Sequence, residues 1–285
     1  MSAEIAGSDR PDAVTGELRL RIGVRHGRGT AIEQYHAGSL RVLRPHYLDA
    51  SGQVCYTVIN PGGGYLGGDR YRIGLNLDAG ASLLFTTQAA TKVYRTPQAP
   101  ARQRTEVRLA AGAVLESVPD PLIAYHDAEY EQLTRVEIDP AASYLASEIV
   151  TPGWSPDGAR FGYTRVSLRT ECRRPGAEAP FLVDALVLEP AVGDVPGLGG
   201  LDGHSHLGSL LLVDARVDAE LVADVWELIE ATSGLRAGAS LAAGPALAVR
   251  ALGDDTAAVE ALLLAVDNAV RSRWWGLPPL NLRKP

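Results

Sequence analysis

The feature that most constrains the fold of this 285-residue chain is a series of short segments in which apolar and polar residues alternate. A side-chain period of two places one face of a segment in a core and the other in water, as in a β-strand. The segments run from Leu18 to Val24, Val54 to Ile59, Tyr71 to Leu77, Ser82 to Thr87, Thr105 to Leu109, Ser143 to Val150, Tyr163 to Leu168 and Phe181 to Leu188. Many short strands separated by glycine, proline or aspartate favour a sandwich, a barrel or a β-solenoid. No fixed-period repeat selects among these three folds.

The last quarter of the chain has a helical period instead. One helix is predicted over residues 218–232, where Asp218 can cap its start and Ser233-Gly234 can end it. A second helix is predicted over residues 255–271, because valine and leucine recur there at helical spacing. The residues from Leu241 to Leu252 are predicted to form one further strand between the helices. The sequence therefore predicts a mainly β body that carries two α-helices near its C-terminus.

Composition limits the class of partner and the location of the protein. Hydrophobic residues make up 46% of the chain, which is typical of a globular protein, and the formal net charge of −7 argues against a nucleic-acid partner. Two cysteines are too few for a disulfide framework or a zinc ribbon, so we expect a reducing cytoplasmic location. No apolar run is long enough for a membrane span. Residues 1–16 lack the apolar region of a signal peptide and are expected to form a flexible tail before a single domain over residues 17–285.

A glycine-rich segment from Asn60 to Asp69 contains a GxGxxG match. A dinucleotide site needs a helix after this loop, but the alternating residues that follow it predict a strand. A phosphate-binding Walker loop would need lysine and serine or threonine where Gly68 and Asp69 lie. Two interpretations therefore remain: a glycine-rich turn, or a close approach of two backbones that presents Asp69 at its end.

The segment from Gly203 to Leu207 nearly matches the GxSxG elbow of hydrolases, but Leu207 replaces the second glycine. It also offers His204 and His206 as two nitrogen ligands for a metal, which would bind weakly without a third ligand. Loop histidines are the preferred interpretation. The acidic residues Asp120, Asp127, Glu129 and Glu131 near a proline-rich stretch are expected to form a solvated turn rather than a pair of acid and base catalysts.

A polar segment from Thr86 to Arg95 directly follows the apolar residues Leu83 to Phe85. Buried polar groups need hydrogen-bond partners or water. The segment therefore predicts either an internal hydrated surface or an interface, or a strand that simply emerges into solvent. The pattern alone favours neither interpretation.

This segment carries a resemblance to a known family. Gly67-Gly68-Asp69, followed by Thr-Thr-Gln-Ala-Ala-Thr-Lys-Val-Tyr-Arg at residues 86–95, resembles the signature of the UreD/UreH family of urease accessory proteins. Leu115-Glu116, with Pro119 to Ile123 after it, is similar to the family's next block. Ser117 replaces the usual tryptophan, and the sequence from Asn281 to Pro285 differs from the usual ending, so local contacts there are in question. The resemblance implies a β-helix-like, solenoid or sandwich-like body of many short strands with helices near the C-terminus.

The resemblance also implies a function without catalysis. A UreD-like chain would act as a cytoplasmic chaperone scaffold that joins UreF and UreG to the urease apoprotein, with homodimeric assembly through that complex. It would offer nickel an internal hydrated passage and hold no cofactor tightly, so nickel would bind only transiently. The alternative from a different class is a metal-dependent hydrolase that uses His204 and His206.

The resemblance and the side-chain chemistry together select the candidate site residues. A carboxylate lowers the electrostatic energy of a cation in a narrow channel, and hydroxyl or amide groups hydrogen-bond its water shell. The candidates for the nickel passage are Asp69, Thr86, Thr87, Gln88, Lys92, Glu116 and Glu148. Trp274 and Trp275 are candidates for partner binding, since adjacent tryptophans do not easily share one core. Against this, both could cover the domain's own core.

Overall fold

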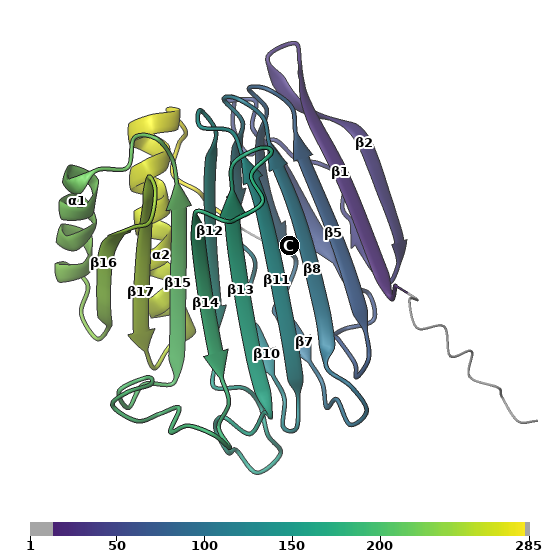
Figure 1. Ribbon diagram of the computed structural model, residues 1–285, viewed down its shortest axis with the longest axis vertical. Coiled ribbons are helices and arrows are strands. Elements are labelled where there is room, and N and C mark those ends of the chain that lie inside the picture. Colours follow the sequence, from purple (N-terminus) through teal and green to yellow (C-terminus); the bar gives the residue numbers. More distant parts are fainter. Residues whose placement is uncertain (1–13, 283–285) are drawn as a thin grey trace, which may run out of the picture.

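Two β-sheets face each other in the computed structural model, which describes residues 14–282 (Figure 1). The front sheet, which faces the viewer in Figure 1, has seven strands. In order across the sheet they are β14 (Leu182–Leu188), β13 (Arg165–Arg173), β11 (Glu129–Ile138), β8 (Ala101–Leu109), β5 (Arg70–Leu77), β1 (Gly16–Arg25) and β2 (Arg28–Gly38). The five strands from β13 to β1 pair in parallel, whereas β14 and β2 pair antiparallel at the two edges.

The back sheet has ten strands. Eight of them form a path in the order β16 (Arg236–Ala242), β17 (Ala246–Gly253), β15 (His206–Val213), β12 (Ser143–Val150), β9 (Val114–Ser117), β6 (Ser82–Thr87), β4 (Val54–Ile59) and β3 (Arg41–Val42). The short strand β10 (Leu122–Ala124) pairs in parallel with β12 and with β7 (Thr91–Val93). The β12, β9, β6 and β4 strands are parallel, and β15, β17 and β16 follow as an antiparallel meander.

The chain winds from one sheet to the other as a β-solenoid. From β5 in the front sheet the chain passes to β6 and β7 in the back sheet and returns to the front sheet as β8. The next coil passes through β9 and β10 in the back sheet and returns as β11, and the one after it passes through β12 and returns as β13. The expected solenoid-like body is thus confirmed. The front strands of successive coils begin at residues 70, 101, 129 and 165, so the coils differ in length. Unequal coils explain why the sequence shows no fixed period.

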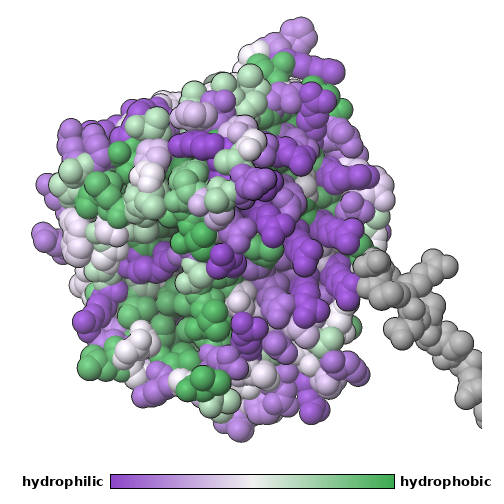
Figure 2. Space-filling view, in the orientation of Figure 1, coloured by the Kyte–Doolittle hydropathy of each residue, from purple (hydrophilic) through white to green (hydrophobic). Residues whose placement is uncertain are grey.

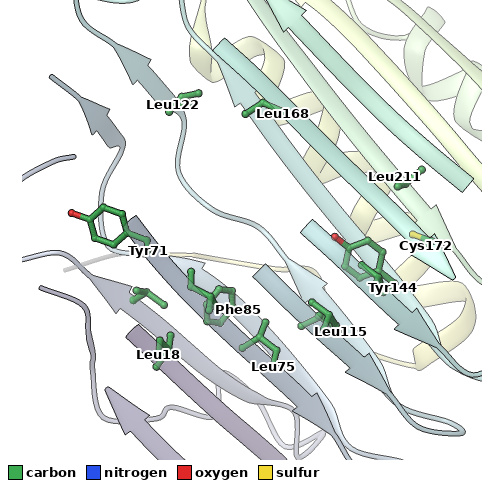
Figure 3. Packing of buried hydrophobic residues seen from close by; sticks show 14 of the residues in the cluster. Leu18, Tyr71, Leu75, Phe85, Leu115, Leu122, Tyr144, Leu168, Cys172 and Leu211 are labelled. Carbon is green, nitrogen blue, oxygen red and sulfur yellow. The ribbon is translucent and has the colours of Figure 1, made fainter. Parts of the chain in front are cut away.

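The alternating residues meet between the sheets, as their period predicts. Leu18, Leu75 and Phe85 point from strands of both sheets into one hydrophobic cluster (Figure 3). The polar members of the same front strands face outward, and hydrophilic residues cover this surface over β8 and β5 (Figure 2). Hydrophobic residues gather toward the edge strand β14, where Val183 and Val187 are exposed (Figure 2).

Two helices cover part of the outer face of the back sheet. The first, α1 (Ala219–Glu230), contacts β16, and the second, α2 (Thr256–Val270), contacts β12, β15 and β17. Asp218 and Asp255 cap the helices, as their carboxylates accept hydrogen bonds from the backbone N–H groups of Leu221 and Ala258. Both helices therefore lie where the sequence predicts them. A turn of π-helix, η1 (Arg271–Trp275), continues α2.

Burial on both faces explains the composition of β15. Its residues Leu210, Leu211, Leu212 and Val213 are all buried, because alternate side chains enter the core between the sheets and the core beneath the helices. Such a strand is almost continuously apolar rather than alternating. The alternation of apolar and polar residues therefore does not identify this strand.

Two predictions about the elements are wrong. The strand predicted from Leu241 to Leu252 is the hairpin of β16 and β17, since the chain turns between them at Gly244, whose φ is +71°. The acidic residues Glu129 and Glu131 lie on strand β11 and not in a turn. Of the predicted tail, residues 1–13 lie outside the described residues, and Gly16 already begins β1. None of the helices in the described part of the chain is long and apolar enough to cross a membrane.

Candidate functional site

Polar residues interrupt the hydrophobic core along one line across the front sheet. Thr105 on β8 is in register with Thr134 on β11, and Thr134 is in register with Thr170 on β13. Two residues back along the same strands, Gln103 pairs in register with Gln132. All five side chains line a cavity of about 120 Å³ between the two sheets. The solenoid therefore contains a polar interior that runs across its coils.

Carboxylates from three elements also line this cavity: Asp120 after β9, Glu148 on β12 and Asp184 on β14. The Thr87 hydroxyl donates a hydrogen bond to Asp120 Oδ2 at 2.9 Å. The guanidinium of Arg250 pairs with Asp184 at the edge of the sheets. Three carboxylates line the cavity and no lysine or arginine of the described residues does, and this acidic character favours a cation over an anion.

The Glu148 carboxyl group has a strongly raised pKa. Burial between the sheets raises its pKa to about 7, and the charge of Asp184 adds to this rise. A hydrogen bond that Gln132 Nε2 donates to Glu148 Oε1 and the charge of Arg250 act in the opposite direction. Tyr130 donates to Gln132 Oε1 at 2.9 Å, which orients that amide toward Glu148. Glu148 therefore changes its charge near neutral pH.

Of the residues predicted for a passage, Thr87 and Glu148 line the cavity. Thr86 is buried with its hydroxyl bonded to the Val118 carbonyl oxygen at 2.6 Å, and it is not among the lining residues. Gln88 is exposed and Lys92 is half-buried on β7, and neither lines the cavity. The structure therefore brings together two of the seven candidates.

Glu116 is separated from the cavity by the alternation of β9. Leu115 and Ser117 line the cavity, whereas Glu116 between them lies on the outer face of the back sheet. It is fully buried there and forms an ion pair with Arg271.

Asp69 organises the glycine-rich loop. Its carboxylate accepts hydrogen bonds from the Thr15 hydroxyl at 3.1 Å, the Leu66 backbone N–H at 2.8 Å and the Tyr71 hydroxyl at 3.1 Å. Asp69 does not line the cavity. The loop also brings two backbone segments close together, because a Cβ atom on Gly64 would lie 2.8 Å from the Lys92 carbonyl oxygen. The turn and the close approach that the sequence left open thus occur together.

The two candidate metal-binding histidines have other partners. His204 Nδ1 lies 3.1 Å from Asp254 Oδ2, and His206 Nδ1 lies 2.8 Å from Ser205 Oγ. Burial lowers the pKa of His206. Within residues 14–282 no group of three or more histidine, cysteine, aspartate or glutamate side chains is arranged to hold a metal ion. Ser205 precedes strand β15 and is buried, unlike the exposed serine of a strand-to-helix elbow.

The two C-terminal tryptophans are half-buried and pack against the hydrophobic cluster beneath the helices. Arg216 stacks over the Trp274 ring at 4.7 Å and donates a hydrogen bond to the Trp274 carbonyl oxygen. The Trp275 indole nitrogen is buried and has no hydrogen-bond partner among the described residues. These contacts support the interpretation that both residues cover the domain's own core, and they leave the partner-binding prediction untested.

Sequence reasoning missed most of the cavity. The missed lining residues are polar and occupy inward positions of otherwise apolar alternating strands; they include Gln103, Thr105, Gln132, Thr134, Thr170 and Asp184. In the sequence, each of these residues is a polar residue at a position where the alternation predicts an inward, apolar side chain, and this could have indicated a polar interior. Only the strand register shows that these positions fall on one line.

The fold and the cavity define a class of protein: a β-solenoid with a polar interior and with two helices on the outer face of one sheet. Residues 14–285 match the family described as UreD urease accessory protein. The chain is 53% identical to the urease accessory protein UreD of Actinomyces naeslundii over 95% of this chain and 99% of that protein. It is 49% identical to the UreD of Arthrobacter sp. (strain FB24) over 94% of each chain, and 33% identical to the UreD of Bacillus sp. (strain TB-90) over 95% of this chain and 98% of that protein. The chain belongs to the UreD family, as its resemblance to that family predicts.

Proposed function

We propose that this protein is a cytoplasmic, non-enzymatic scaffold for urease maturation. It joins UreF and UreG to the urease apoprotein, in an assembly that becomes homodimeric through the complex, and it lets nickel pass through its interior. Family membership supports the role in maturation. The observation that carries the nickel passage is the polar cavity between the sheets with Glu148 at its wall.

The side chains of this cavity suit the transit of a hydrated divalent cation. Hydroxyl and amide groups of Thr134, Thr170 and Gln132 can hydrogen-bond water around the ion without binding the metal itself. A passage must bind the ion weakly enough to release it, as in conduction pores. Because the pKa of Glu148 is about 7, protons compete with a cation for its carboxylate at neutral pH, and this competition weakens binding.

The test is urease activation under limiting nickel by the Glu148→Gln variant, co-expressed with UreF, UreG and the urease apoprotein. The variant keeps the shape and hydrogen-bonding capacity of the side chain but removes its charge. We expect normal co-purification with the partners and a several-fold loss of nickel in the urease. The matched control is Glu260→Gln, which changes an exposed glutamate on α2. If Glu148→Gln delivers nickel as fast as the wild type, the passage is wrong, and if the wild type fails to co-purify with UreF, the scaffold is wrong.

The hydrolase alternative makes a different prediction. Gly68 and Asp69 lie where a Walker loop needs lysine and serine or threonine, and Leu207 breaks the GxSxG match, so we expect no GTPase, ATPase or esterase activity from the purified chain. The pairing of His204 with Asp254 and of His206 with Ser205 provides no third metal ligand among the described residues. Replacing both histidines with alanine should leave urease activation unchanged. Turnover that follows the elution peak of the chain and disappears in the double variant would instead support the hydrolase.

A further inference from the structure

A cluster of ionisable side chains lies on the outer face of the back sheet, away from the cavity. Glu116 on β9, Asp267 on α2 and Arg271 on η1 expose no more than 1% of their surface each. Gln53, which precedes β4, donates a hydrogen bond to Glu116 Oε2. The helix, the sheet and the C-terminal segment therefore enclose two carboxyl groups and one guanidinium.

Within the cluster, Glu116 has hydrogen-bond partners and Asp267 has none among the described residues. Arg271 Nη1 donates to both oxygens of Glu116, at 2.5 and 2.6 Å, and also to Gln53 Oε1 at 3.2 Å. Both carboxyl oxygens of Asp267, in contrast, are buried and accept no hydrogen bond from any described residue. An ionised carboxylate without a partner is very costly in such a place. The single charge of Arg271 is already matched by Glu116.

Hydrogen bonds also hold the C-terminal segment, residues 277–282, next to this cluster. Arg271 Nε donates a hydrogen bond to the Pro278 carbonyl oxygen at 2.9 Å, and the Leu280 N–H donates to Asn268 Oδ1 at 2.7 Å. Leu280 is buried in a small apolar cluster with Cys55 and Leu84. The segment of residues 277–282 thus covers the sheet beside the buried charges.

We propose that Asp267 and Glu116 together bind one proton, and that this proton holds the C-terminal segment, residues 277–282, on the back sheet. The bound proton forms a hydrogen bond from the carboxylic acid of one residue to the carboxylate of the other. It gives Asp267 its missing partner and leaves the cluster neutral, with one negative and one positive charge. Loss of the proton leaves a second negative charge in the buried cluster.

The electrostatics around Asp267 support the site. Burial raises the pKa of Asp267 well above its usual value, the nearby carboxyl group of Glu116 raises it further, and the charge of Arg271 acts in the opposite direction. The groups that face the site are Glu116 from β9, Arg271 from η1 and Gln53 before β4, with the Cys55 thiol of β4 in the adjoining apolar cluster. Since the folded state holds the proton more strongly than the unfolded chain, stability contributed by this cluster decreases as pH rises.

Water can reach the uncompensated charge most easily from the C-terminal side. Opening the segment of residues 277–282 admits water to the charges at the cost of three hydrogen bonds and the burial of Leu277 and Leu280. Separating α2 from the sheet would expose far more, including Val259, Leu262 and Val266. The segment should therefore open first when the proton is lost.

Hydrogen exchange monitored by mass spectrometry tests the proposal on the full chain. Protection of peptides from residues 264–282, corrected for the intrinsic pH dependence of exchange, is compared from about pH 6 to about pH 9 in the wild type, Asp267→Asn and the control Glu260→Gln. The side-chain amide that Asp267→Asn introduces supplies the hydrogen-bond donor permanently. We expect protection in the wild type and in the control to fall about tenfold or more with rising pH, which corresponds to about 1.4 kcal/mol, and protection in Asp267→Asn to stay constant.

Equal pH dependence in the wild type and in Asp267→Asn would overturn the proposal. If Asp267→Asn does not fold, infrared spectroscopy of Glu148→Gln decides instead, because this change removes the other buried carboxyl group with a raised pKa. A protonated carboxyl band that persists at about pH 7 and disappears together with protection of the C-terminal peptides supports the proton site. Absence of that band at about pH 7 refutes it. Neither result depends on urease activation, so this inference fails or survives separately from the proposed function.

Discussion

At the scale of single residues, one position along a strand decides what a glutamate does in this protein. Glu148 on β12 points into the cavity between the sheets, where burial raises its pKa to about 7. Glu116 on β9 points to the other face of the same sheet and is neutralised by Arg271. The sequence offered both residues as equal candidates for the passage. Their difference depends on the direction of each side chain, which a family motif does not specify.

The first residue prediction concerns the pH dependence of stability. The folded pKa of Glu148, about 7, lies above its unfolded value of 4.5, so the contribution of this group to stability is lost as pH rises between those values. Glu148→Gln should remove this loss and make the protein more stable at about pH 8 by about 2 kcal/mol. Denaturant unfolding at about pH 4.5 and about pH 8 measures it. A variant that is destabilised equally at both pH values would contradict the prediction.

A second prediction separates two roles for Asp69. Its carboxylate accepts three hydrogen bonds that hold the glycine-rich loop, and an asparagine can accept fewer of them. We expect Asp69→Asn to lower the free energy of unfolding by about 1 kcal/mol, with nickel delivery per folded molecule unchanged. Thermal unfolding and the nickel content of co-expressed urease provide the two measurements. Unchanged stability with reduced nickel would restore Asp69 to the passage.

A third prediction concerns Trp275, which packs against the cluster beneath the helices. Trp275→Ala should lower the free energy of unfolding by about 2 kcal/mol, because a half-buried aromatic ring is removed. The partner-binding hypothesis predicts instead a loss of UreF binding at an unchanged melting temperature. Measuring both quantities on the same preparation distinguishes the two. The exposed Trp226 on α1 provides a matched control as Trp226→Ala.

At the scale of elements, the contact between α2 and β15 depends on one glycine. A Cβ atom on Gly208 would lie 2.4 Å from Val259 Cγ1, too close for the helix to keep its position. Gly208→Ala should therefore displace α2 and cost about 1–3 kcal/mol of stability. Gly74→Ala is the control, because a Cβ there meets Arg19 Cγ at an ordinary 3.5 Å. Equal stability of the two variants, measured by denaturant unfolding, would show that α2 is free to shift.

The elements also show which sequence signals were sufficient. Alternation located strands such as β5, the capping residue Asp218 located α1, and the helical spacing of valine and leucine located α2, because these signals are local. The β16–β17 hairpin was missed because its apolar residues continue almost without interruption across Gly244. Strand β15 was missed because it is buried on both faces. Local patterns do not identify a strand that packs against protein on both faces, because such a strand has no polar face toward water.

At the scale of the whole molecule, the solenoid followed from the family resemblance and not from a repeat in the sequence. The coils have unequal lengths, so their equivalent residues cannot be aligned by a constant spacing. The unequal coil lengths also explain why the cavity could not be predicted from the sequence. Thr105, Thr134 and Thr170 are far apart in sequence and become neighbours only through the parallel register of β8, β11 and β13. The proton site is a similar case, since Glu116 and Asp267 meet only after α2 packs on the back sheet.

The parallel coils carry a consequence for how far such an assembly can grow. A stack of parallel coils ends in strands whose free backbone groups could accept a neighbouring molecule and extend into a fibre. In this protein the antiparallel strand β2, whose register with β1 shifts at Arg21/Ile22, closes one end of the front sheet, and the antiparallel strand β14 closes the other. The reversed direction of both edge strands interrupts the parallel register that a further coil would continue, so they act as chain terminators in the sense of polymer chemistry. They give the protein a finite length, and with it a discrete interior that begins and ends within one molecule.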